Sequence, residues 1–236
     1  MNPSFKRGLR NGIPIALGYL SVAFGFGIMA TRAGLTVTQA VILSASNMTS
    51  AGQVAGVSII AAGGTYWEMA LTQLVINLRY ALMSLSLSQK LDPSFHTPQR
   101  MIASFGITDE IFALSSMEMD LVKPWYMYGL ILISCFGWSF GTFLGAAAGS
   151  LLPQVLSDAM GIMLYGMFLA VVIPPARAHR SVMVAALLAA ACSIVCYYFL
   201  SFLSSGFAVI ITSVVAASVT ALIYPLDDEK EEEAAA

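Results

Sequence analysis

The sequence has few charged residues. Asp, Glu, Lys and Arg make up 10% of its 236 residues, against about 25% in an ordinary soluble domain. Hydrophobic residues make up 58%, more than a single globular core of this length could bury. The composition therefore predicts an all-α polytopic membrane protein, with a single transmembrane domain over 1–226. The acidic tail over 227–236 is expected to be disordered and cytoplasmic.

Cysteine is also rare, and the common catalytic motifs are absent. The three cysteines, Cys135, Cys192 and Cys196, lie inside apolar runs, which favours core packing over a disulfide framework or a metal site. The sequence contains no G-x-x-x-x-G-K-[ST] run and no H-E-x-x-H run. Its charge balance offers no basic face for nucleic acid. We therefore expect no enzyme activity, no metal or cofactor, and no nucleic acid partner.

Long apolar runs give the outline of the topology. A bilayer core of about 30 Å requires roughly 20 helical residues. The candidate spans are 11–31, 37–63, 68–88, 101–117, 125–150, 159–176, 181–201 and 205–224. Two of these, 37–63 and 101–117, have polar centres. If both re-enter, about six full transmembrane helices remain and the basic loop 89–100 is cytoplasmic with the N-terminus. If one or both cross, the chain has seven or eight spans. The positive-inside rule favours six spans plus two broken or re-entrant elements.

The segment 125–150 carries glycines at a spacing of four residues, at Gly137, Gly141, Gly145 and Gly149. This spacing places them on one helix face, where the lack of side chains lets another helix approach closely. The pattern predicts tight helix packing and carries no chemistry.

The segment 37–63 has no charge, but its centre is rich in hydroxyl, amide and glycine residues. This centre reads SASNMTSAGQVAG over 44–56. Serine, threonine and asparagine compete for backbone hydrogen bonds, and glycine weakens a helix. The pattern predicts a discontinuous helix whose unwound backbone lines a cavity.

The segment 68–88 is the span around which the chain is organised, because it carries Arg79 near its middle. A guanidinium at mid-bilayer costs about 2.5 to 3.5 kcal/mol on insertion scales. We therefore predict that Arg79 faces a partner or a water-lined cavity. Helical spacing puts Gln73 and Asn77 on one stripe and Glu68 and Arg79 on another, so this helix needs polar neighbours on two sides. Glu68, at the start of the span, is expected at the membrane interface.

The segment 101–117 is short for a span and carries Asp109 and Glu110 in its middle. It is therefore predicted to be a second broken or re-entrant element. The planar fork of Arg79 suits a carboxylate, which could belong to Asp109, to Glu110 or to a substrate. A purely structural clamp between Arg79 and Asp109 is the alternative.

Three stretches carry a family resemblance: SAGQVAG (50–56), VINLRYALMSLSLS (75–88) and ITDEIFALS (107–115). In this order the chain resembles the AzlC family, the large subunits of bacterial branched-chain amino acid exporters. It departs from the family pattern at Val54, where an aromatic residue usually follows the glutamine. This departure points to a remodelled pocket wall.

The resemblance implies export of branched-chain or similar apolar amino acids across a bacterial inner membrane, coupled to the proton motive force. It also implies a small second membrane subunit of the AzlD type. On this reading Asn47, Thr49, Gln53 and Asn77 bind the polar head of the substrate. Arg79 binds its carboxylate, and Asp109 or Glu110 couples a proton. The alternatives are a passive channel for small solutes and a membrane scaffold without its own flux.

Overall fold

The computed structural model describes residues 2–149, 172–200 and 202–225, together with positions 155, 159, 166 and 169. The helices in this part are α1 (Pro3–Arg32), α2 (Val37–Ser46), α3 (Ala51–Ala61), α4 (Tyr66–Ser88), α5 (Thr97–Phe105), α6 (Asp109–Ser116), α7 (Pro124–Ala148), α9 (Arg180–Phe199) and α10 (Ser205–Ile223). Five of them, α1, α4, α7, α9 and α10, are long and apolar enough to cross a membrane. The predicted all-α membrane class is therefore confirmed. Most of the predicted span 159–176 and the whole acidic tail lie outside the described residues.

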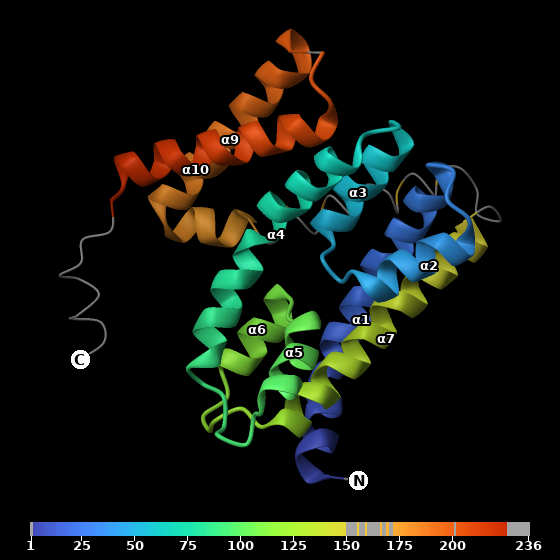
Figure 1. The fold of residues 1–236 in the computed structure, drawn as a ribbon, viewed down its shortest axis with the longest axis vertical. Helices are drawn as coiled ribbons and strands as arrows, with labels where there is room; N and C mark the ends of the chain where they lie inside the picture. Colours follow the sequence, from blue (N-terminus) through green and yellow to red (C-terminus); the bar gives the residue numbers. More distant parts are fainter. Residues whose placement is uncertain are drawn as a thin grey trace.

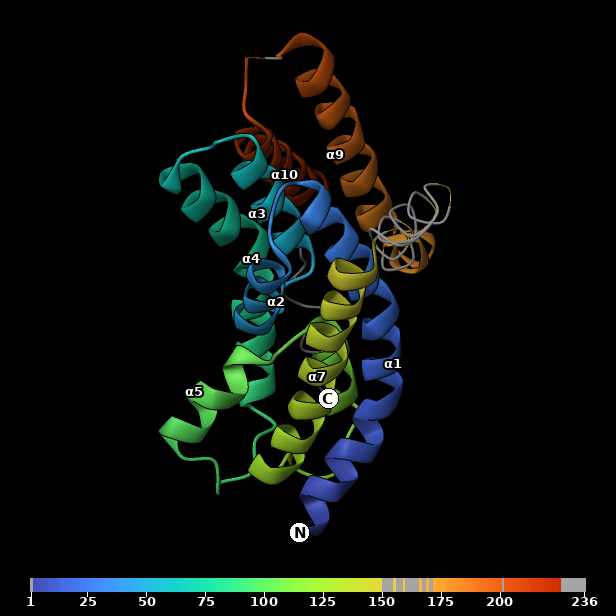
Figure 2. The ribbon, with the colours of Figure 1, turned by 90° about the vertical axis from the view of Figure 1, so that its right-hand side faces the viewer.

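Helices α1 and α7 form the longest contact of the fold and run side by side (Figures 1 and 2). The predicted glycine face of α7 makes this contact. A Cβ atom added at Gly137 would lie 2.8 Å from Ala16 Cα, and one added at Gly145 would overlap the carbonyl of Phe24. The two backbones touch because no side chain separates them, as the glycine spacing predicts.

A leucine at Gly137 is therefore expected to force α1 and α7 apart. Overpacking a tight contact costs about 1–3 kcal/mol or more, so Gly137→Leu should lower the thermal unfolding midpoint of the purified protein in detergent. Gly18→Leu on α1 is the matched control, because an atom added at Gly18 meets no described atom within 4 Å. Equal midpoints for the two variants would contradict the α1–α7 contact.

The predicted break in 37–63 is present. Helix α2 ends at Ser46 and α3 begins at Ala51. Val57 of α3 packs in one cluster with Ala30 of α1 and Ala40 of α2. Helix α3 therefore returns to the end of the molecule from which α2 entered, opposite the N-terminus (Figure 1).

The second predicted break is present as well, between α5 and α6. The loops on either side of this pair meet, because Leu91 and Val122 form an isolated β-bridge and Lys90 Nζ donates to the carbonyl of Ser116 at 2.5 Å. The pair α5–α6 therefore enters and leaves at one end, the end that carries the N-terminus (Figure 1). Both polar segments therefore turn back at their breaks, as expected for re-entrant elements, and the described residues contain five of the six predicted full spans.

The two re-entrant elements approach each other from opposite ends of the molecule. Helix α1 followed by α2–α3, and helix α4 followed by α5–α6, repeat one pattern in opposite orientations (Figure 1). Inverted repeats with interrupted helices place the two breaks near the middle of the fold. Helices α9 and α10 pack on each other, and α10 also contacts α3 and α4.

Candidate functional site

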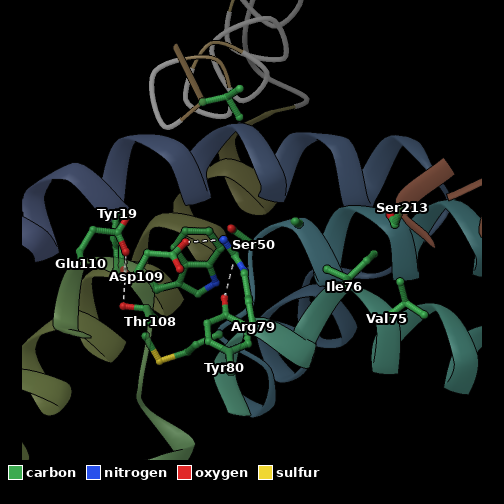
Figure 3. A pocket seen from close by; sticks show the side chains of 14 residues that line it. Tyr19, Ser50, Val75, Ile76, Arg79, Tyr80, Thr108, Asp109, Glu110 and Ser213 are labelled. Carbon is green, nitrogen blue, oxygen red and sulfur yellow. Dashed lines mark hydrogen bonds and ion pairs between the residues drawn. The ribbon is translucent and has the colours of Figure 1, made fainter. Parts of the chain in front are cut away.

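A cavity of about 440 Å³ lies where the two breaks meet α1, α4 and α7 (Figure 3). Its volume falls within the range of about 300 to 1,000 Å³ that is typical of small-molecule sites. Its polar lining comprises Tyr19, Ser50, Arg79, Tyr80, Thr108, Asp109, Glu110 and Ser213. Its apolar lining comprises Met48, Ala51, Val75, Ile76, Trp138 and Val172.

The Arg79 guanidinium lies in this cavity and pairs with Asp109. Nη1 donates to Asp109 Oδ2 at 2.6 Å, and Nη2 donates to the Tyr80 hydroxyl at 3.2 Å. The guanidinium also lies 4.9 Å from the centre of the Tyr80 ring, a distance at which a cation is attracted to the ring face. Three of its five N–H groups have no partner in the described part of the chain. The prediction that Arg79 faces a partner and a cavity is confirmed.

The first turn of α6 presents both carboxylates to the cavity. Thr108 caps this helix, with its hydroxyl accepting from the backbone N–H of Ile111. Asp109 and Glu110 are the first two residues of the helix, where the helix dipole stabilises negative charge. The Tyr19 hydroxyl lies 2.5 Å from both Thr108 Oγ1 and Glu110 Oε2. Glu110 is thus held by α1, while Asp109 is held by Arg79 of α4.

The break between α2 and α3 forms the facing wall. Ser50 has a φ of 31°, in a region that non-glycine residues rarely occupy and that costs of order 1–3 kcal/mol. Gln73 Nε2 donates to the carbonyl of Gly52 at 2.8 Å, which ties the start of α3 to α4. The strained backbone at Ser50 therefore lies against the cavity and is held by a side chain from the neighbouring helix.

Gln53 is placed beside the cavity but does not line it. Its side chain is fully buried, and its Oε1 accepts from Trp138 Nε1 at 2.9 Å. Its Nε2 donates to the carbonyl of Leu43 and to Ser44 Oγ, both at 3.2 Å. The amide thus joins α2, α3 and α7 and fixes the Trp138 ring that forms part of the cavity wall.

Gln53→Leu is expected to destabilise the fold, because it leaves the buried indole N–H of Trp138 without a partner. A group unpaired in this way costs about 1–3 kcal/mol. Gln89→Leu is the control, since Gln89 is exposed at the end of α4. Thermal unfolding of both variants in detergent measures the difference. Adding Trp138→Phe should recover part of the loss, whereas full additivity would argue against the hydrogen bond.

The other predicted amide and hydroxyl residues bond to each other or to neighbours. Thr49 Oγ1 donates to Asn47 Oδ1 at 2.8 Å within the break. Asn77 Nδ2 donates to Gln73 Oε1 at 3.0 Å, while Asn77 Oδ1 is buried and has no partner within the described ranges. The structure thus brings Arg79, Asp109 and Glu110 together in the cavity. It places Asn47, Thr49, Gln53 and Asn77 around the α2–α3 break, outside the cavity lining.

Sequence reasoning missed the aromatic and hydroxyl residues of the site, namely Tyr19, Tyr80, Thr108 and Trp138. Tyr80 directly follows Arg79, and Thr108 directly precedes Asp109 and Glu110. Their position next to predicted site residues could have identified both as candidates. Tyr19 and Trp138 lie on α1 and α7, far from any motif, and only the fold brings them here.

These features define a multi-pass membrane protein with a polar cavity enclosed by two interrupted helices. The chain belongs to the AzlC family, whose model, described as AzlC protein, matches residues 14–152. This match spans both re-entrant elements and most of the cavity lining. The family and the fold establish a role related to membrane transport, and the predicted multi-pass membrane location is confirmed.

Three similar proteins from other organisms are named as membrane proteins. Inner membrane protein YgaZ of Escherichia coli is 30% identical over 188 residues, which cover 77% of each chain. An uncharacterized membrane protein of Archaeoglobus fulgidus is 32% identical over 176 residues, which cover 72% of this chain and 75% of the relative. A similarly named protein of Helicobacter pylori strain J99 is 26% identical over 151 residues, 62% of this chain and 65% of the relative. No solved structure matches the chain at a significant level.

Proposed function

We propose that this protein is a secondary transporter that exports a small apolar amino acid across a bacterial inner membrane, driven by protons. The observation that supports this best is a cavity that contains the Arg79–Asp109 ion pair and a second carboxylate, Glu110, beside apolar side chains. An apolar amino acid matches this lining, because its charged head group suits the charged residues and its hydrocarbon side chain suits the apolar ones.

The substrate carboxylate would bind the unpaired N–H groups of Arg79, and its ammonium would lie between Asp109 and Glu110. Its side chain would pack on the apolar wall formed by Ile76 and Trp138. The ammonium requires an ionised carboxylate beside it, so a proton that binds Asp109 would weaken substrate binding. Solute and proton would then exclude each other from the site. This exclusion would exchange an outgoing solute for an incoming proton.

The predicted polar-head residues receive a different proposed role. Asn47, Thr49, Gln53 and Asn77 would hold the interrupted segment in shape rather than contact the substrate in this conformation. Family membership further suggests a small AzlD-like membrane subunit, which should co-purify with the tagged chain when both are expressed together.

Transport by the purified protein in proteoliposomes tests the proposal. Labelled leucine, isoleucine, valine and methionine would be offered with and without an imposed pH gradient. We expect at least one of them to accumulate above its external concentration only when the gradient is present. Flux that ignores the gradient would favour a channel, and no flux of any of them, alone or with the small subunit, would favour a scaffold.

A further inference from the structure

Glu68 is a buried carboxylate that the central cavity does not use. It lies in the first turn of α4, with 4% of its surface exposed, although its neighbours Tyr66 and Trp67 are exposed. It was expected to face the membrane interface. Instead its Oε1 accepts from the backbone N–H of Gly206, in the first turn of α10, at 3.1 Å. The carboxylate therefore pins the start of α10 to α4.

Two buried hydroxyl groups accompany this contact without bonding to it. Thr72 lies one turn along α4 from Glu68 and is fully buried, and its Oγ1 has no partner among the described residues. A Cβ atom added at Gly206 would lie 2.6 Å from Thr72 Oγ1 and 2.7 Å from Glu68 Oε1, so both oxygens border the same small space. Ser204 Oγ, at the N-cap of α10, is also buried and has no partner in the part of the chain that the structure describes. Buried polar atoms are rarely left unpaired, and a carboxylic acid O–H would supply a donor here.

The Glu68 carboxylate lies beside two helix N-termini in this arrangement. The carboxylate lies at the first turn of both α4 and α10, where helix dipoles attract negative charge. Helices α3 and α10, which pack against this end of α4, contain no charged residue. Arg79, the cation on α4, lies eleven residues further along, about 16 Å away at 1.5 Å per residue. In the described part of the chain, Glu68 is therefore the charged group that contacts the first turn of α10 at this end of α4.

A second, mostly apolar cavity lies next to the central one and reaches Gly206. It has a volume of about 350 Å³ and lies between α3, α4 and α10. Ala51 and Ile76 line both cavities, and Gly206 lines the second. The Glu68–Gly206 contact therefore lies at the edge of the second cavity, because Gly206 takes part in both.

We propose that Glu68 is a second proton-binding site, which controls whether the first turn of α10 stays on α4. An external proton converts the carboxylate to a carboxylic acid, whose O–H donates to the Thr72 hydroxyl. The hydrogen bond from Gly206 then loses its charge and weakens, α10 moves off, and the second cavity opens. The link from this release to solute export rests on the proposed function, whereas the proton binding and the helix release do not.

Hydrogen exchange of the purified protein in nanodiscs tests the release without any substrate. After correction for the intrinsic pH dependence of exchange, protection of the backbone amides over 205–209 should fall about tenfold between about pH 7 and about pH 3, a range that brackets the ordinary protonation of a carboxyl group. Glu68→Gln, which cannot ionise, should show the low protection at both pH values. Glu118→Gln is the control, because Glu118 pairs with Arg7 at the opposite end and should leave the wild-type profile unchanged.

Thr72→Val provides a second variant in case Glu68→Gln folds poorly. It removes the acceptor for the acid O–H, so the loss of protection should move to lower pH. Wild-type protection that does not depend on pH, or a Thr72→Val profile identical to wild type, would overturn the proposal. Neither result would bear on whether the central cavity binds an amino acid.

Discussion

Arg79→Gln is expected to reduce transport at least about a hundredfold while the protein still folds and inserts. Glutamine keeps an amide donor but loses the positive charge and the planar fork. The variant would lose two hydrogen bonds to the substrate carboxylate, each worth about 1.5–3 kcal/mol because the groups are charged, and about 2.8 kcal/mol corresponds to a hundredfold. Uptake by proteoliposomes, normalised to the amount of reconstituted protein, measures the loss.

The control for this variant is Arg10→Gln. Arg10 is exposed near the start of α1, so the same substitution there should leave uptake within about twofold of wild type. Arg79→Lys separates charge from geometry, because lysine keeps the cation but cannot form the bidentate fork. Normal uptake by Arg79→Gln, with an unchanged unfolding midpoint, would make the Arg79–Asp109 pair a structural clamp and remove the proposed transport site.

Asp109→Asn is expected to abolish concentrative transport while preserving exchange of substrate for substrate. Asparagine can still accept a hydrogen bond from Arg79 but cannot take up a proton, so a pH gradient no longer drives the solute. Counterflow across the same membrane requires only binding and reorientation, and it should stay within about tenfold of wild type. The two assays together separate coupling from binding.

Asp92→Asn serves as the matched control for this second prediction. Asp92 lies in the loop after α4, where hydrogen bonds from the hydroxyl and the backbone N–H of Ser94 hold its pKa below the usual range. It therefore stays ionised across the assay range and should not affect the response to a pH gradient. If Asp109→Asn still accumulates substrate against its gradient, Asp109 is not a coupling residue.

Much of the fold could be predicted from the sequence because the polar interruptions have local causes. Serine, asparagine and glycine around Asn47 favour an unwound backbone wherever the helix lies, and the pair Asp109–Glu110 makes an ordinary span too costly. The polar stripes of α4 were also predictable from helical periodicity. Gln73 does bond to α3 and Asn77 bonds to Gln73, while Arg79 faces α6.

The contacts within the site could not be predicted in the same way. Helical periodicity shows which face of a helix is polar, but not which other helix packs against that face. From the sequence alone, Gln53 could be a substrate ligand or a buried core amide. The fold decides between them, because the Gln53 side chain bonds to Trp138 of α7 and to Ser44 of α2. Tyr19 reaches Glu110 across 91 residues of sequence, a pairing that no local pattern encodes. Glu68 is buried because α10, far along the chain, returns to cover it.

Equilibrium binding of the transported amino acid, in competition with its analogue lacking the carboxylate, tests the role of Arg79 most directly. Wild-type protein should bind the amino acid at least about a hundredfold more tightly than the matching primary amine. The Arg79→Gln variant should lose most of this preference and bind the two compounds about equally. A variant that keeps the full preference for the carboxylate would show that the guanidinium does not bind the substrate.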